Sequence, residues 1–279
     1  MKIINKMNQY EKTGTEETVV APVFMVKNGI TVYPGGTRSE FHDNVLCEHF
    51  TEVSVNNIPF IRLSCTPSFL PELVTGRLYT EGLIDSADEV SSIYICGTGA
   101  VMEVLLTKQV KPAGHVYEEK TCCTGNFNRT TLEGARKPKN LPNTVIDKDI
   151  VFELVERFKN DSHLHRETFG THSCYLRTPD GKIHEFEDIS RHNAMDKAVG
   201  YALMNNYNLN ECVLYTTGRI PQDMVYKCIM AGIPTLVSKS VPTDAALKMA
   251  AKYGLNLICC AWPDSYRIYT DDTSDRAFE

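Results

Sequence analysis

The chain has 279 residues, of which 42% are apolar, and a formal net charge of −6. A chain of this length can bury a substantial core and form one large domain or two smaller ones. The acidic balance argues against nucleic acid as the main partner, because proteins that bind phosphate backbones usually present a basic face. The sequence lacks the long apolar run of a membrane span, and its first residues lack the features of a signal peptide. We therefore expect a globular, cytoplasmic protein with neither a nucleic-acid nor a membrane partner.

The N-terminal part predicts a small α+β domain. Residues 1–21 are polar, mixed in charge and without periodicity, which predicts a flexible arm. Alternating apolar residues then predict strands over 52–55 and 59–63, with a turn at Asn56 and Asn57. Helical spacing of leucines predicts a helix that begins near residue 68 and ends at Gly82, and two further strands are expected over 90–96 and 100–107. Residues 22–117 should form this domain.

Residues 118–144 have no helix or strand period and are rich in Gly, Asn, Thr, Pro and basic residues. Loops of this length are usually functional or mobile. The loop contains two adjacent cysteines, Cys122 and Cys123, with Lys120 and Arg129 on either side. Cations and exposed backbone N–H groups lower the pKa of a thiol. We therefore favour a nucleophilic or sulfur-carrying role for this pair over two incidental loop thiols.

Several of the other cysteines lie in apolar runs, such as the ones around Cys96 and around Cys259 and Cys260. This placement is typical of reduced, buried thiols rather than of a disulfide scaffold. His163 and His165 are separated by one residue, but no cysteine or carboxylate stands near them at zinc-ligand spacing, and the chain has no C-x-x-C motif. We therefore expect neither a zinc site nor another resident metal.

The C-terminal part, residues 145–279, predicts a second domain. A helix is expected over 148–160, then a hairpin of 173–177 and 182–186 turned at residues 179–181, then a helix over 190–205 with Ser190 as its N-cap. Strands over 212–216, 234–238 and 256–261 alternate with helices over 222–230 and 243–253, which end at Gly232 and Gly254. This alternation predicts right-handed crossovers and a parallel sheet.

Three loops follow the strands of this repeat, at residues 217–219, 239–242 and 262–265. Because the carboxyl ends of parallel strands meet at one edge of a sheet, the loops should converge where open α/β sheets bind ligands. Two cations, a glycine and two helix N-termini suit a phosphate or pyrophosphate. The residues expected to hold it are Gly218, Arg219, Lys239 and Ser240.

The helix over 190–205 has an unusual polar side. Its buried stripe should consist of Ala194, Met195, Ala198, Val199 and Ala202, which leaves Arg191, His192, Asn193, Asp196 and Lys197 on the opposite side. The i, i+4 spacing predicts a His192–Asp196 pair and an Asn193–Lys197 pair. A solvated helix face is the plain alternative, but the variety of polar groups favours binding or catalysis. His172 is a second candidate, for which a purely structural role is equally favoured.

These segments together resemble the formate dehydrogenase accessory sulfurtransferases, the FdhD-type sulfur carriers. The most specific match is the run EDISRHNAMDK at residues 187–197. It is followed by TGRI at 217–220, MVYK at 224–227, AGIP at 231–234 and SVPT at 240–243. In the N-terminal part, ELVTG at 72–76 and EGLI at 81–84 agree as well. The resemblance covers about residues 45–270.

The resemblance implies an α/β fold, α+β overall. Its C-terminal domain would be a three-layer α/β/α mixed sheet of cytidine-deaminase-like type with an antiparallel first strand, beside a smaller N-terminal α+β roll. It also implies a sulfur carrier that takes sulfur as a cysteine persulfide from a cysteine desulfurase. The carrier delivers it to a molybdenum or tungsten bis-guanine-dinucleotide cofactor, bound as substrate, before that cofactor enters formate dehydrogenase. A homodimer is implied too. Deamination is not, because the sequence lacks the zinc-ligand set of deaminases.

Residue by residue, the resemblance places the persulfide on Cys123. Many members have a second cysteine three residues later, where this chain has Asn126, so either Cys122 is the partner thiol or one cysteine suffices. His192 with Asp196, and His172, would orient the cofactor or transfer protons. Trp262 would stack on it, and Arg267 would replace the arginines that this chain lacks. The cofactor-contacting segment falls on Cys260, Ala261, Trp262, Pro263, Asp264 and Ser265.

Three other functions stay open at this point. A non-catalytic chaperone for the molybdenum cofactor would need the phosphate site but not Cys123. A thiol–disulfide oxidoreductase would use Cys122 and Cys123 with each other, although a disulfide between adjacent cysteines is strained and no thioredoxin-like motif is present. A guanine-nucleotide-binding regulatory module would bind GDP or GTP without a partner enzyme.

Overall fold

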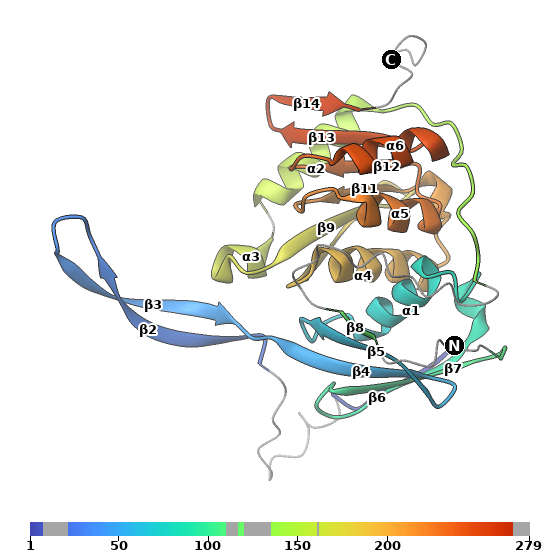
Figure 1. The fold of residues 1–279 in the computed structure, drawn as a ribbon, viewed down its shortest axis with the longest axis horizontal. Helices are drawn as coiled ribbons and strands as arrows, with labels where there is room; N and C mark the ends of the chain where they lie inside the picture. The colour runs from blue at the N-terminus through green and yellow to red at the C-terminus, as the bar shows by residue number, and fades with distance from the viewer. Residues whose placement is uncertain (8–21, 110–116, 120–134, 161, 270–279) are drawn as a thin grey trace.

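The computed structural model describes residues 1–7, 22–109, 117–119, 135–160 and 162–269. Within these ranges the chain forms two six-stranded sheets and a separate two-stranded hairpin. Figure 1 shows the sheets on opposite sides of a central pair of helices, α1 (Leu70–Thr80) and α4 (Arg191–Met204). The helix α1 covers the N-terminal sheet, and α4 covers the C-terminal sheet. The α+β class predicted from the sequence is confirmed.

The N-terminal sheet has the strand order β1-β6-β7-β4-β5-β8. Asn56 and Asn57 turn one strand into the next with φ values of 50° and 64°, in the left-handed region that asparagine tolerates better than most residues. The four strands and the helix predicted for this domain are confirmed. The strands are β1 (Lys2–Asn5), β4 (His49–Val55), β5 (Ile58–Cys65), β6 (Val90–Ile95), β7 (Val101–Leu106) and β8 (Tyr117–Glu119).

Two strands of this sheet depart from the prediction. The strand β1 lies inside the predicted flexible arm, yet it pairs in parallel with β6, so residues 2–5 belong to the sheet. The strand β8 crosses the predicted boundary between the N-terminal domain and the cysteine loop, and it pairs in parallel with β5. Both are short and lie at the edges of the sheet, and strands so placed leave little hydrophobic pattern in the sequence.

The C-terminal sheet has the strand order β10-β9-β11-β12-β13-β14. The central three strands are parallel, and β9 and β14 flank them in antiparallel pairing. This confirms the parallel repeat and the antiparallel strand before it, whereas β14, which follows residues 262–265, is not predicted. The strands are β9 (His172–Arg177), β10 (Ile183–Asp188), β11 (Val213–Thr216), β12 (Thr235–Ser238), β13 (Asn256–Trp262) and β14 (Ser265–Ile268).

Helices cover both faces of the C-terminal sheet. The helices α4, α5 (Gln222–Ala231) and α6 (Asp244–Tyr253) bury apolar side chains against one face, and α2 (Lys148–Asn160) buries its own against the other. Gly232 and Gly254 end α5 and α6 with positive φ, as predicted. The narrower likeness to cytidine deaminases, and to a roll in the N-terminal domain, stays a prediction. No helix in the described ranges combines the length and apolar character of a membrane span.

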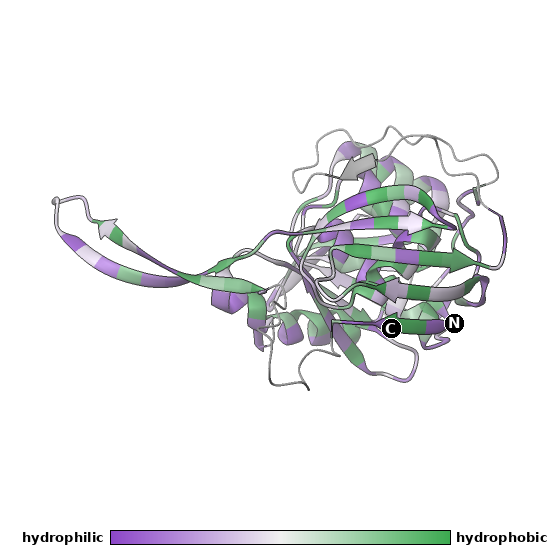
Figure 2. Ribbon diagram, turned by 90° about the horizontal axis from the view of Figure 1, so that it is seen from below, coloured by the Kyte–Doolittle hydropathy of each residue, from purple (hydrophilic) through white to green (hydrophobic). Residues whose placement is uncertain are grey.

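The hairpin of β2 (Phe24–Val32) and β3 (Arg38–Leu46) projects away from the body (Figure 1). Figure 2 shows polar and apolar residues alternating along it. Val26, Ile30 and Val32 lie on one face of β2 and are exposed. The short helix α3 (His163–Thr168) lies near the base of the hairpin. The sequence predicts neither the hairpin nor α3, because neither presents a long buried stripe.

Candidate functional site

The helices α1 and α4 cross in direct backbone contact. A Cβ atom on Gly200 would lie 1.9 Å from the backbone oxygen of Glu72, and a Cβ atom on Gly76 would lie 1.8 Å from that of Asp196. Only glycine allows an approach this close. As a result, α4 packs against the sheet on one side and against α1 on the other. The alternative of a solvated polar face is therefore wrong, since all five polar residues predicted as candidates are buried.

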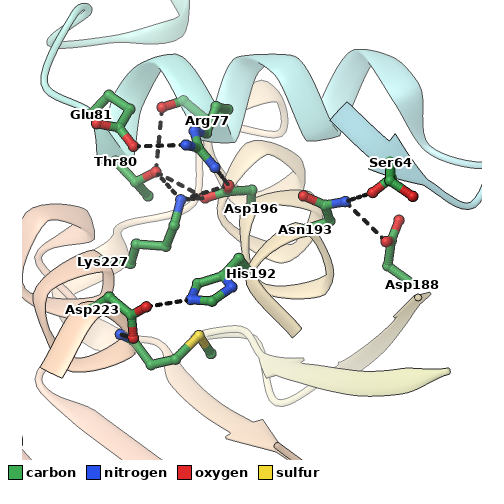
Figure 3. Close-up of polar contacts among 11 residues, drawn as sticks. Ser64, Arg77, Thr80, Glu81, Asp188, His192, Asn193, Asp196, Asp223 and Lys227 are labelled. Carbon is green, nitrogen blue, oxygen red and sulfur yellow. Dashed lines mark hydrogen bonds and ion pairs between the residues drawn. The ribbon is translucent and has the colours of Figure 1, made fainter. Parts of the chain in front are cut away.

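Asp196 lies at the centre of a polar network that joins three helices (Figure 3). Lys227 on α5 donates to its carboxylate at 2.7 Å, and the hydroxyl of Thr80 on α1 donates to it at 2.8 Å. The guanidinium of Arg77 lies 3.8 Å away and also pairs with Glu81 at 3.2 Å. A buried ion pair of this kind balances desolvation against attraction and hydrogen bonding. The network ties the N-terminal domain to α4 and α5.

A second network joins α4 to strand β5 and to the end of β10. The Lys197 ammonium lies 2.7 Å from Asp188 and donates to the hydroxyl of Thr66, also at 2.7 Å. The amide of Asn193 donates to the backbone oxygen of Ser64 at 2.8 Å and to Asp188 at 3.0 Å (Figure 3). These contacts cross the same domain interface as the first network.

The predicted i, i+4 pairs are therefore wrong. The imidazole of His192 bonds to Asp223 on α5, and the carboxylate of Asp196 bonds to Lys227 and Thr80. Lys197 and Asn193 each bond to Asp188 instead of to each other. The reason is that a neighbouring element packs against this side of α4 and supplies closer partners. Asn193, Asp196 and Lys197 are at most 1% exposed, so a cofactor cannot reach their side chains while the domains are docked.

The three loops at the carboxyl edge of the sheet converge, as predicted. The hydroxyl of Ser238 donates to the backbone oxygen of Gly218 at 2.8 Å, which links the first loop to the second. The backbone N–H of Cys260 donates to the oxygen of Ser240 at 2.9 Å, which links the second loop to β13. Lys239 and Ser240 are half-buried, and Arg219 is exposed. The edge thus presents cations and backbone groups from separate segments to one place.

An apolar cavity of about 130 Å³ opens beside this edge, between α2 and the turn after β13. The Lys239 ammonium lies 4.9 Å from the ring centre of Phe158 and 5.3 Å from that of Trp262, in cation–π contact with both. Tyr215 is fully buried in the lining, and its hydroxyl has no hydrogen-bond partner within the described residues. Aromatic walls beside a cation suit a flat heterocycle.

The segment 260–265 lies at this cavity, and its residues are accessible to different degrees. Ala261 is buried, and Cys260 is half-buried with a φ of 50°. Trp262, Pro263, Asp264 and Ser265 are exposed. Of the six, Ala261, Trp262 and Pro263 line the cavity. Arg267 is the residue expected to replace the arginines that the cofactor-contacting segment lacks. It lies on β14, opposite Cys259 of β13, and is exposed.

His172 is the first residue of β9, and His192 lies in the first turn of α4. The His192 imidazole and the Asp223 carboxylate are 2.9 Å apart, and this hydrogen bond and charge hold the pKa of Asp223 below its usual value although burial raises it. Burial lowers the pKa of His172, the charges of Arg191 and His165 act in the same direction, and together they bring it to about 4. Asp223 is not among the residues predicted from the sequence. Asp223 lies in the first turn of α5, which follows the loop at residues 217–219, and this position is the signal in the sequence that could have identified it.

The cysteine pair predicted to carry sulfur, Cys122 and Cys123, lies outside the described residues. Five described cysteines are buried, as predicted, and burial raises their pKa values, to about 12 for Cys212 and Cys259. Cys96 differs from the prediction. It is half-buried, and its pKa is lowered despite desolvation, because the Thr98 hydroxyl and the backbone N–H of Val101 contact its sulfur at 3.3 Å.

Metal coordination finds no support among the described side chains, which form no group of three or more potential ligands. His165 instead contacts the backbone oxygen of Thr171 through Nδ1, at 2.8 Å. His163 contacts Arg166 at 3.3 Å.

Known proteins resemble this chain over most of its length. A sulfur carrier protein FdhD from Sulfurisphaera tokodaii is 35% identical over 207 residues, which cover 74% of this chain and 80% of the relative. One from Wolinella succinogenes is 30% identical and covers 83% of this chain and 82% of its own length. The crystal structure of a protein described as a formate dehydrogenase accessory protein, from Desulfotalea psychrophila, superposes with a TM-score of 0.74. It is 24% identical and covers 92% of this chain and all of the other, so it supports the fold. The model of the FdhD/NarQ family matches residues 46–276, and the chain belongs to this family.

Proposed function

We propose that the protein is a sulfurtransferase that carries sulfur as a persulfide on Cys123. A cysteine desulfurase supplies the sulfur, and the acceptor is a molybdenum or tungsten bis-guanine-dinucleotide cofactor, bound as substrate before it enters formate dehydrogenase. The observation that carries the proposal is the convergence of three loops beside an aromatic cavity. Relatives of this chain are named sulfur carrier proteins, which supports the same activity. The proposal includes a homodimer and a cytoplasmic location.

The loading step follows from thiol chemistry. The Cys123 thiolate attacks the outer sulfur of the donor's persulfide, and the donor's cysteine leaves as a thiolate. The transferred sulfur then stays on Cys123 as a new persulfide. Lys120 and Arg129, in the same loop, favour the thiolate form by their charge. Cys122 is placed to serve as a second thiol, and the comparison of single variants decides whether it is needed.

The acceptor would lie along the carboxyl edge. Gly218, Ser240 and their neighbours would hold the phosphates through backbone N–H groups, with Lys239 and Arg219 supplying charge. A guanine base would occupy the adjacent cavity, where Trp262 offers a stacking face. Asn193, Asp196 and Lys197 would act indirectly, by holding α4 in place. His192 lies in the first turn of this helix and His172 begins β9, and both would orient the cofactor or transfer protons.

The experiment is intact-mass spectrometry after incubation with a cysteine desulfurase and cysteine. Wild type should gain one sulfur, about 32 Da, since a persulfide adds one sulfur atom to the thiol. Cys123→Ala should gain none, and Cys122→Ala should gain the same sulfur as wild type if one cysteine suffices. An unchanged mass in wild type would refute the sulfurtransferase and leave a cofactor-binding chaperone as the better account.

A further inference from the structure

Arg191 differs from the other buried cations of the described structure. Lys197, Lys227 and Arg77 each lie within ion-pair distance of a carboxylate. Arg191 is 8% exposed, its Nε is buried without a hydrogen-bond partner, and no ion pair joins it to another described residue. A buried charge without a partner is costly, because its desolvation is not offset by attraction or by hydrogen bonds. Such a group in a folded protein indicates a missing anionic partner.

The surroundings of Arg191 favour an anion. Arg191 is the first residue of α4, a helix of 14 residues, and its N-cap Ser190 makes no side-chain cap hydrogen bond. The N-terminus of such a helix carries unpaired N–H groups and a partial positive charge. The aliphatic stem of Arg191 lies on Gly218, where an added Cβ atom would meet its Cδ at 2.9 Å. Glycine at this position therefore lets the Arg191 side chain lie beside the loop at residues 217–219.

The acidic groups nearby already have hydrogen-bond partners. The carboxylate of Asp223, on which Arg191 acts electrostatically, is bonded to His192, and Asp188 is bonded to Lys197. His172, the first residue of β9, faces Arg191. The charges of Arg191, His165 and His192 all act on the His172 imidazole. The Arg191 guanidinium therefore has no carboxylate within ion-pair distance among the described residues, in a place from which most water is excluded.

We propose that Arg191, the N-terminus of α4 and His172 form a buried receiving site for a compact anion, either the terminal sulfur of a persulfide or a phosphate group. The identity of the anion rests on the proposed function, whereas the existence of the site does not. The low exposure of Arg191 favours a small group over a whole nucleotide. The site adjoins the loop of Gly218, so a sulfur held there would lie next to the place proposed for the cofactor phosphates.

The test compares thermal unfolding of the full chain in sodium phosphate, in sodium hydrosulfide and in sodium chloride at equal ionic strength. Wild type should be stabilised in a saturable manner by phosphate, by hydrosulfide or by both, with a rise in Tm of about 2–4 °C, since ligands that bind only the folded state raise its stability. A response to phosphate alone identifies the phosphate source, and a response to hydrosulfide alone identifies the sulfur source. Equal Tm values in all three salts would overturn the proposal.

Arg191→Met separates a ligand site from a structural arginine. It keeps the length of the stem and removes the unpaired charge, so the unliganded Tm should stay the same or rise, and the response to the anion should be lost. A lower Tm with the response retained would overturn the proposal. Arg191→Lys keeps the charge and should retain a weakened response, which covers the case in which Arg191→Met does not fold. Arg38→Met removes an exposed guanidinium on β3 and should change neither quantity.

A second measurement follows the His172 imidazole by NMR during a pH titration. Saturation with the effective anion should move its titration to higher pH, because a bound anion offsets the charge of Arg191. In Arg191→Met the titration should begin at higher pH and show no further change with the anion. An identical titration of wild type with and without the anion would contradict the site. Because no desulfurase is present, a failure here is distinct from the absence of a sulfur gain on Cys123.

Discussion

The start of α4 and the turns that follow it face different surroundings. Along the helix, Asn193, Asp196 and Lys197 are buried and fully engaged with the N-terminal domain. At its start and along the neighbouring sheet edge, the Nε of Arg191 and the hydroxyl of Tyr215 are buried without hydrogen-bond partners among the described residues. Satisfied polar groups hold elements together, whereas unsatisfied ones reduce stability and persist where a ligand supplies the missing contact. The run at residues 187–197 therefore combines side chains with buried partners and one, Arg191, whose Nε has none among the described residues.

The largest effect should come from breaking the satisfied part. Lys227→Met leaves the Asp196 carboxylate buried without its closest cation, which should cost about 3–5 kcal/mol of unfolding free energy. Urea denaturation measures this loss. Lys248→Met breaks an exposed ion pair with Asp244 and should cost less than about 1 kcal/mol. Equal losses in the two variants would mean that the buried network does not hold the domains.

Gly200→Ala should be nearly as damaging. Alanine normally favours a helix over glycine, but here its Cβ would lie 1.9 Å from the Glu72 oxygen, so the two helices must separate. We expect a loss of more than about 3 kcal/mol, measured in the same urea experiment, because overpacking that moves a backbone is costly. Gly35→Ala, in the hairpin turn where nothing lies within 4 Å, provides the control. Tolerance of alanine at position 200 would show that the helices do not cross in direct backbone contact.

The region around Arg191 should reveal itself through pH. His172 has a folded pKa of about 4 against an ordinary 6.5, so between these values the unfolded chain binds a proton that the folded chain does not. Stability should therefore fall as the pH falls from 6.5 to 4, by about 2–3 kcal/mol from this group. His172→Asn should flatten this part of the stability–pH curve. A flat wild-type curve would contradict the burial of His172 beside Arg191.

The smallest and sharpest test uses two buried tyrosines whose rings are 6.0 Å apart. The Tyr175 hydroxyl donates to Glu185 at 2.8 Å and contacts Ser162, whereas the Tyr215 hydroxyl has no partner among the described residues. Tyr175→Phe should cost about 1–2 kcal/mol, and Tyr215→Phe should cost nothing or stabilise the protein slightly. The reverse order of stability would remove the distinction between the two regions.

The sequence predicts what depends on local pattern. The helix α2 has the bounds expected from its apolar spacing, and the ends of α5 and α6 follow from Gly232 and Gly254. The strands β11, β12 and β13 follow from short apolar runs. Their alternation with helices is enough to predict a parallel order, and that order brings three loops to one edge of the sheet.

The rest depends on contacts between distant residues. Spacing along one helix suggests that His192 pairs with Asp196, but its partner on another helix is Asp223. Likewise, Lys197 reaches Thr66, which is 131 residues away in sequence. The hairpin is not predicted because β2 is mostly exposed and packs on no core. Its alternation of apolar and polar residues is therefore free to be interrupted, as it is at Asn28 and Gly29. The orphaned Tyr215 hydroxyl has no signal in the sequence, since burial and partner are both properties of the fold.

The glycine-mediated crossing of α1 and α4 has a consequence for cooperativity. No layer of side chains separates the two backbones at that point, so one domain cannot loosen without disrupting the other. The two sheets should therefore unfold in a single transition, and the amides of both helices should exchange with solvent only through global opening. The carboxyl edge of the C-terminal sheet thus owes part of its rigidity to strands of the N-terminal sheet, which do not take part in forming it.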